Sequence, residues 1–227
     1  MKRRIIFLLL LVVMGSHAFA QKPAESSQTR LILKSISARY KKLGNWKARF
    51  TQETSSPGLG TGSVSEGQFE FVGPSKFRYS LVRPEQSAFI SNGREAWQII
   101  KRKDKATYVR HFRDLRKIDL ERYLLILRGF DNPEGKVFAE LSKKFEIQAQ
   151  FKNEEIVVEF RPKNASEVTS LTLYFKNDSE APAKAVIKDS LDTTTTLVIM
   201  SFESIKNPID KKLFTPEYPK DSEIEEL

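Results

Sequence analysis

Residue types that commonly carry out catalysis are few in this 227-residue chain. It contains two histidines, His17 and His111, and no cysteine. A zinc site needs a cluster of such ligands, and a serine or cysteine nucleophile needs a base beside it, so the sequence argues against both. The glycine-rich segment 58–62 lacks the lysine of a phosphate-binding loop. The 29 acidic residues could include the two catalytic carboxylates of a glycosidase, but nothing in their sequence context identifies such a pair. We therefore expect no enzyme, no cofactor and no metal.

The chemistry that the sequence does offer is apolar binding by aromatic side chains. Phe69 and Phe71, and then Phe77 and Tyr79, recur at every second position. A period of two is the strand period, so these rings share one face of a sheet. Gly73-Pro74-Ser75 predicts a turn between the two runs, and Asn92-Gly93 predicts a second hairpin. These patterns predict a strongly curved antiparallel sheet with an aromatic concave face.

The rest of the chain supplies the elements around that face. Ser27 suits an N-cap and Gly44 a C-terminal glycine, which predicts a helix over 27–43 that lies along the sheet. Further strands are predicted over 106–112, 145–151, 155–160, 168–175, 183–187 and 194–202. The fold class is therefore mainly β (α+β), an incomplete antiparallel barrel in one domain over 21–227. We expect the acidic tail 221–227 to be disordered.

Segment 118–129 predicts a second helix that is apolar nearly all round. Leu120, Tyr123, Leu124 and Leu127 make one face, whereas Leu125 and Ile126 fall off it. A surface helix needs only one apolar stripe, so this helix should contact apolar surface on two sides. One side suits the rim of the sheet. The other side suits a cavity, a ligand or a second packed layer, and the pattern leaves these alternatives open.

The N-terminus predicts export. Three basic residues, an apolar run over 5–14 and the small residues around Phe19 form a cleavable signal peptide over 1–20. An uncleaved membrane anchor is the alternative. Without cysteine there is no disulfide and no acceptor for a lipoprotein anchor. The full chain carries a net charge of +9, and removal of Lys2, Arg3 and Arg4 leaves +6. Export argues against nucleic acid as a partner. The basic segment 101–117 suits either a docking site or a solvated rim.

Several short pieces, in order along the chain, carry a resemblance to a known family. They are Trp46 to Gln52, Glu66-Gly67-Gln68, Pro74 with Phe77 and Tyr79, Pro84 to Ser87, Ser91-Asn92-Gly93 with Trp97, Phe160 to Lys163, and Asn207 with Phe214 and Pro216. The chain resembles the LolA family of periplasmic outer-membrane lipoprotein carriers. The resemblance implies a monomeric incomplete barrel whose lid helices cover a hydrophobic cavity for lipoprotein acyl chains. It also implies an inner-membrane ABC transporter as donor, an outer-membrane acceptor, and localisation in the periplasm.

The resemblance also implies site residues. The cavity would be lined by Phe50, Phe69, Phe71, Phe77, Tyr79, Phe89 and Trp97. The lid would be formed by Leu120, Tyr123, Leu124, Leu125, Ile126 and Leu127. The family usually has an arginine that latches the lid immediately before the turn proline, where this chain has Gly73. Arg78 and Arg83 are the candidate replacement latches.

Two other function classes stay open at this stage. Related half-barrels serve as periplasmic sensors that bind a signalling protein or a lipoprotein. A β scaffold with a filled core and only a protein-binding role is the third class. Lipid recovered with the protein would separate a carrier from a scaffold, and onward transfer of cargo would separate a carrier from a sensor.

Overall fold

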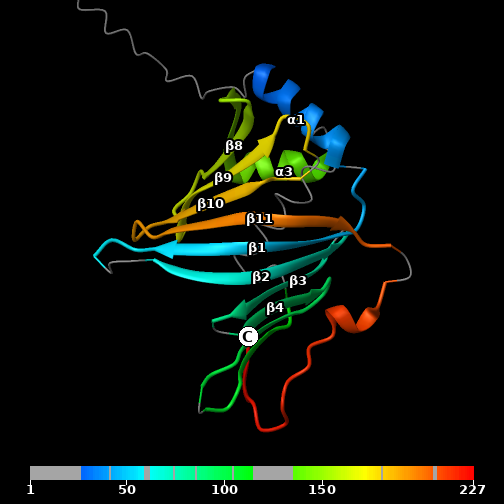
Figure 1. The fold of residues 1–227 in the computed structure, drawn as a ribbon, viewed down its shortest axis with the longest axis vertical. Helices are drawn as coiled ribbons and strands as arrows, with labels where there is room; N and C mark the ends of the chain where they lie inside the picture. The colour runs from blue at the N-terminus through cyan, green and yellow to red at the C-terminus, as the bar shows by residue number, and fades with distance from the viewer. Residues whose placement is uncertain are drawn as a thin grey trace, which may run out of the picture.

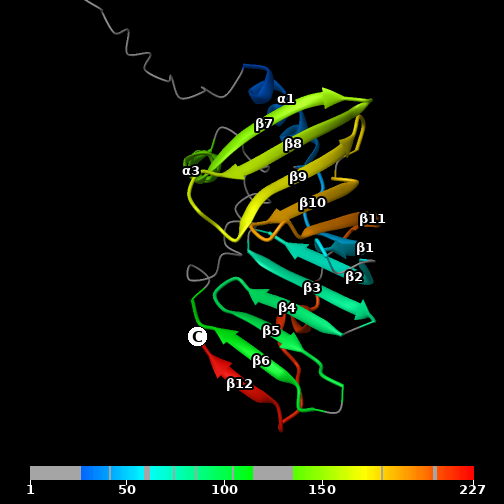
Figure 2. The same ribbon diagram turned by 90° about the vertical axis from the view of Figure 1, so that its left-hand side faces the viewer.

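One large sheet organises the chain (Figures 1 and 2). The computed structural model describes residues 27–40, 42–58, 62–73, 75–84, 86–103, 105–114, 135–179, 181–206 and 209–227. Within these residues the sheet has 12 strands in the order β12-β6-β5-β4-β3-β2-β1-β11-β10-β9-β8-β7. The strands are β1 (Trp46–Ser55), β2 (Ser63–Val72), β3 (Lys76–Arg83), β4 (Ser87–Asn92), β5 (Ala96–Ile100), β6 (Tyr108–Phe112), β7 (Phe145–Lys152), β8 (Glu155–Pro162), β9 (Val168–Lys176), β10 (Lys184–Asp189), β11 (Thr194–Ser204) and β12 (Glu223–Glu226). The helical elements are α1 (Ser27–Tyr40), α3 (Lys136–Lys144) and the short 3-10 helix η2 (Lys211–Phe214).

The sheet is curled but open, with β12 at one end of the strand order and β7 at the other. A twisted sheet of this size curls because each strand is rotated relative to its neighbour. We call the face toward α1 and α3 the inner face, since the main core joins side chains of both helices to the sheet there. The predicted mainly β, incomplete barrel is confirmed as an open half-barrel. One pairing differs from the prediction, because β12 runs parallel to β6.

Helix α1 begins at Ser27 as predicted and ends at Tyr40, a turn earlier than expected. Its apolar stripe is buried against the inner face, and Leu33 and Ile36 are each 1% exposed. Gly44 has a φ of 58°, a conformation that favours glycine and turns the chain toward β1. The helix also covers the edge strand β7, because the backbone N–H of Ala149 donates to the Thr29 hydroxyl at 3.2 Å.

Helix α3 was not predicted from the sequence. Its buried residues Phe138 and Leu141 are spaced by three, and its basic residues Lys143 and Lys144 fall in the last turn. Both features are typical of an amphipathic helix. The helix is only 9 residues long and leads directly into β7, so its pattern merges with that of the strand.

The acidic tail is ordered, which corrects the prediction of disorder over 221–227. Ion pairs join Glu223 to Arg102 at 3.0 Å, Glu225 to Arg110 at 3.0 Å and Glu226 to Arg113 at 2.9 Å. The Glu225 carboxylate also accepts from the Tyr108 hydroxyl. The tail's acidic residues therefore match basic residues that lie on or beside β6, and backbone pairing adds it to the sheet.

Two predictions lie outside the described residues. These are the signal peptide over 1–20 and the lid helix over 118–129 with its six lid side chains. The described part of the chain contains no helix that is long and apolar enough to cross a membrane.

Candidate functional site

A ladder of aromatic rings crosses the inner face from β11 to β6. Its ring centroids are separated by 4.9 Å (Phe202–Trp46), 5.0 Å (Trp46–Phe69), 6.1 Å (Phe69–Phe77), 5.7 Å (Phe77–Phe89) and 6.0 Å (Phe89–Phe112). These separations fall in the range that is favourable for aromatic pairs. Strand register places Phe69 opposite Tyr79, not Phe77, so the ladder runs diagonally across the strands. We call these six residues the aromatic ladder.

A second ring pair lies beside the aromatic ladder. Phe50 on β1 stacks on Tyr79 of β3 with a centroid separation of 5.1 Å, although β2 lies between them. The pair can form because Gly67 stands opposite Phe50 on β2 and has no side chain. A Cβ at Gly67 would lie 2.2 Å from Phe50 Cζ. The Tyr79 hydroxyl donates to Gln52 Oε1, and burial raises the pKa of Tyr79 to about 12.

The aromatic ladder is not uniformly buried. Phe77 is 2% exposed, whereas Phe69, Phe89 and Phe112 are half-buried. A ring that is fully enclosed stabilises the core, and a ring that is partly open can still contact a ligand. The inner face therefore combines a fixed centre with open aromatic surface on both sides of it.

The structure brings together six of the seven predicted cavity residues, since Phe50, Phe71 and Tyr79 adjoin the ladder that contains Phe69, Phe77 and Phe89. Trp46, Phe112 and Phe202 were missed. The alternation Trp46, Ala48, Phe50 placed Trp46 on the inner face and was a usable signal. The hydrophobic cavity itself stays a prediction.

Trp97 is a correction, because it lies on the outer face. It is paired with Ile90, and both belong to a small second core with Ile99 and Val109. Phe89 is the neighbour of Ile90 along β4, so the strand alternation sends it to the opposite face. Trp97 stacks on His111 at a centroid distance of 4.9 Å.

The two candidate latches make other contacts in the described residues. Arg78 alternates with Phe77 and Tyr79, so it lies on the outer face, where its guanidinium donates to the Leu213 carbonyl at 3.4 Å. Arg83 pairs with Glu66 at 2.7 Å on the exposed surface. Arg78 therefore joins the C-terminal segment to the outer face, a placement that does not favour it as a lid latch. Any contact of Arg83 with segment 118–129 lies outside the described residues.

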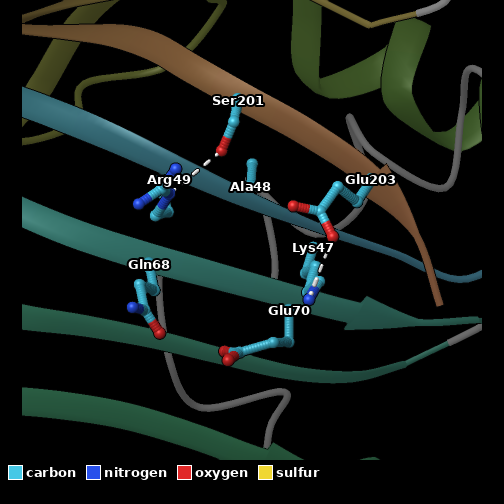
Figure 3. A pocket seen from close by; sticks show the side chains of 7 residues that line it. All are labelled: Lys47, Ala48, Arg49, Gln68, Glu70, Ser201 and Glu203. Atoms are coloured by element: carbon cyan, nitrogen blue, oxygen red, sulfur yellow. Dashed lines mark hydrogen bonds and ion pairs between the residues drawn. The ribbon is translucent and has the colours of Figure 1, made fainter.

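A polar depression lies on the outer face across β11, β1 and β2 (Figure 3). Its volume is about 230 Å³, and its lining includes Lys47, Arg49, Glu70 and Glu203. Lys47 pairs with Glu203 at 3.1 Å, and both side chains are more than half exposed. Burial raises the pKa of Glu70, and the nearby Arg78 and Lys47 partly offset that effect. The Lys47–Glu203 pair joins neighbouring strands across this surface, and the charged lining offers no apolar site.

The curled sheet and its aromatic inner face define the class of the protein. It is an open half-barrel whose aromatic inner face is covered by helices at one end. The chain belongs to the family described as outer membrane lipoprotein carrier protein LolA, whose model matches residues 41–217.

Two curated relatives carry the name outer-membrane lipoprotein carrier protein. The one from Leptothrix cholodnii is 26% identical over 143 residues, which cover 63% of this chain and 55% of the relative. The one from Methylibium petroleiphilum is 35% identical over 51 residues, which cover 22% of this chain and 25% of the relative. The chain therefore matches about half, or less, of the length of these relatives.

Similar solved structures include a LolA superfamily protein from Nitrosomonas europaea, with 13% identity and a TM-score of 0.43. That match covers 81% of this chain and 97% of the other. A structure of MucB has 12% identity and a TM-score of 0.48, and the match covers 86% of this chain and 66% of the other.

Proposed function

We propose that this protein is a periplasmic carrier that binds the acyl chains of lipoproteins and shields them from water. The aromatic ladder is the observation that carries the proposal, because it lays half-buried rings along one face of a curled sheet. Membership of the lipoprotein carrier family supports the same substrate class.

The energetics of acyl chains require such a carrier. Each exposed CH₂ costs about 0.8 kcal/mol relative to burial, so a chain of about 14 CH₂ groups costs roughly 11 kcal/mol in water. A carrier that buries the acyl chains removes this free-energy cost while the lipoprotein crosses the periplasm. In this proposal the carrier accepts and releases its cargo without hydrolysing ATP itself. In this proposal an inner-membrane ABC transporter loads the protein and an outer-membrane acceptor unloads it.

The test is a transfer assay with a diacyl lipopeptide. The purified protein is mixed with donor vesicles that contain the lipopeptide, and lipopeptide that leaves the vesicles bound to protein is measured. Acceptor vesicles are then added. We expect the protein to extract the lipopeptide and to deliver it onward.

Two variants locate the binding face. Phe89→Glu places a charge in the middle of the aromatic ladder and should abolish extraction. Met200→Glu changes a β11 residue that is 66% exposed and should leave extraction intact. Extraction without onward delivery would favour a sensor over a carrier, and failure of the natural protein to extract lipopeptide would overturn the proposal.

A further inference from the structure

The inner face carries a row of polar side chains beside the aromatic ladder. Gln52, Tyr79, Gln98 and Arg110 belong to β1, β3, β5 and β6. Phe89 of the ladder is paired with Tyr79 on one side and with Gln98 on the other, and Gln98 is paired with Arg110. Directly paired residues of neighbouring strands share a face. The row therefore lies on the same face as the rings and flanks them.

The two ends of this row already have partners within the protein. At one end the Tyr79 hydroxyl donates to Gln52. At the other end Arg110 Nε donates to Glu225 at 3.0 Å, and because a guanidinium has five N–H donors, Arg110 can donate to a further acceptor as well. These contacts hold the polar groups in place along the edge of the ladder.

Gln98, in the middle of the row, is different. Its half-buried amide has no hydrogen-bond partner among the residues that the structure describes, although it lies beside the half-buried ring of Phe89. A glutamine amide provides two N–H donors and one acceptor. A position that served only to extend the apolar face would favour an aliphatic side chain, as Ile100 two residues later does.

We propose that Gln98 and Arg110 bind the ester carbonyls at the head of the acyl chains while the aromatic ladder contacts the chains themselves. This inference rests on the proposed function. An ester carbonyl only accepts hydrogen bonds, and both side chains offer donors on the inner face. These hydrogen bonds would position the end of each acyl chain that is joined to the head group. The protein would then recognise the ester linkage as well as the hydrocarbon.

The experiment compares two lipopeptides that differ only in those carbonyls. One is a cysteine peptide with two hexadecanoyl esters on its glyceryl group, and the other carries two hexadecyl ethers instead. Each is titrated against a bound fluorescent acyl probe. The natural protein should prefer the diester by more than the roughly 2- to 12-fold that one neutral hydrogen bond contributes, because Arg110 adds a second, charged donor.

Two variants at one position test the donors. Gln98→Leu removes the amide, and Gln98→Glu keeps the shape but replaces the N–H donors with acceptors. Both should lower the diester-to-diether ratio by roughly 2- to 12-fold, the contribution of one neutral hydrogen bond, and Gln98→Leu should leave diether binding unchanged. Gln68→Leu, on the outer face beside Arg49, is the matched control and should keep the natural ratio.

The other possible results overturn either the carbonyl-binding role or the carrier proposal. If the natural protein binds both lipopeptides equally, or if the Gln98 variants weaken both to the same extent, the carbonyl-binding role is wrong although the carrier proposal survives. If the natural protein binds neither lipopeptide, the carrier proposal itself fails. Thermal unfolding of every variant shows whether the compared proteins are folded.

Discussion

Gly67 offers a stringent test of the inner-face geometry, because a methyl group there has no room. A Cβ would lie 2.2 Å from Phe50 Cζ, 2.6 Å from Phe50 Cε2 and 2.8 Å from the Ser80 carbonyl oxygen. Gly67→Ala must therefore displace the Phe50 ring from its stack on Tyr79. Overpacking of this kind costs about 1–3 kcal/mol, so we expect the free energy of unfolding in urea to fall by that amount.

The control for this prediction is Gly73→Ala. Among the residues that the structure describes, a Cβ at Gly73 would meet only Phe71 Cε1 at 3.7 Å, and Gly73 has no positive φ. A glycine-to-alanine change at such a compatible site stabilises by about 0.4–1 kcal/mol through the unfolded state. The two substitutions should therefore change stability in opposite directions.

A double-mutant cycle assigns the cost to the ring. In a Phe50→Leu background the outer ring atoms are gone, so Gly67→Ala should cost less, with a coupling of about 1 kcal/mol. Part of the cost should remain because the Ser80 carbonyl is backbone. The same cost of Gly67→Ala in both backgrounds would refute the reasoning.

Three further predictions follow from the other sites. Burial raises the pKa of Glu70, so ionisation of Glu70 destabilises the fold as pH rises. Glu70→Gln should therefore raise the free energy of unfolding in urea at pH 7, and this gain should vanish well below pH 4.5, where Glu70 is protonated. The pKa of Glu225 is lowered by hydrogen bonds from Tyr108 and Arg110, so the stability that these bonds contribute is lost as pH falls. Protection of the β12 amides, measured relative to their intrinsic exchange rates, should therefore fall in acid; unchanged protection would show that backbone pairing alone holds the strand. Phe77→Ala should cost about 3–5 kcal/mol in urea unfolding, since the ring is 2% exposed; a smaller loss would mean that the site collapses around the gap.

The last prediction links the Gly73 position to segment 118–129. A Cβ at Gly73 lies at an ordinary contact distance from Phe71, so we expect Gly73→Arg to fold. If the family arginine latches the lid, this variant should slow hydrogen exchange across 119–128 relative to the natural protein. Equal protection in both proteins would show that the natural lid is already held without that arginine.

Local alternation predicted much of the sheet and of its aromatic face. The strand period placed Phe69, Phe71, Phe77 and Tyr79 on one face, and the structure confirms that placement. The helix over 27–43 was predicted from its caps and its stripe, and its first residue is confirmed. These features depend on neighbours in sequence, which a single chain displays directly.

Two of the errors depend on pairing between strands. Trp97 was predicted to line the cavity from the family resemblance, but the register Ile90↔Trp97 decides its side. The acidic tail and the basic residues near β6 were each described correctly as charge runs. Only the fold shows that Glu225 and Arg110, 115 positions apart, are partners.

The pairing of β1 with β11 has a consequence for the kinetics of folding. β1 (Trp46–Ser55) lies between β2, which follows it closely in sequence, and β11 (Thr194–Ser204), which follows much later. The hairpins β2–β3 and β7–β8 need only short loops, so each half of the sheet can assemble by itself. Joining the halves requires closure of a loop that spans most of the chain, and contacts of such separation form slowly. Until they form, β1 and β11 each present an open edge to other chains, and this junction is where a slow or crowded folding reaction would begin to aggregate.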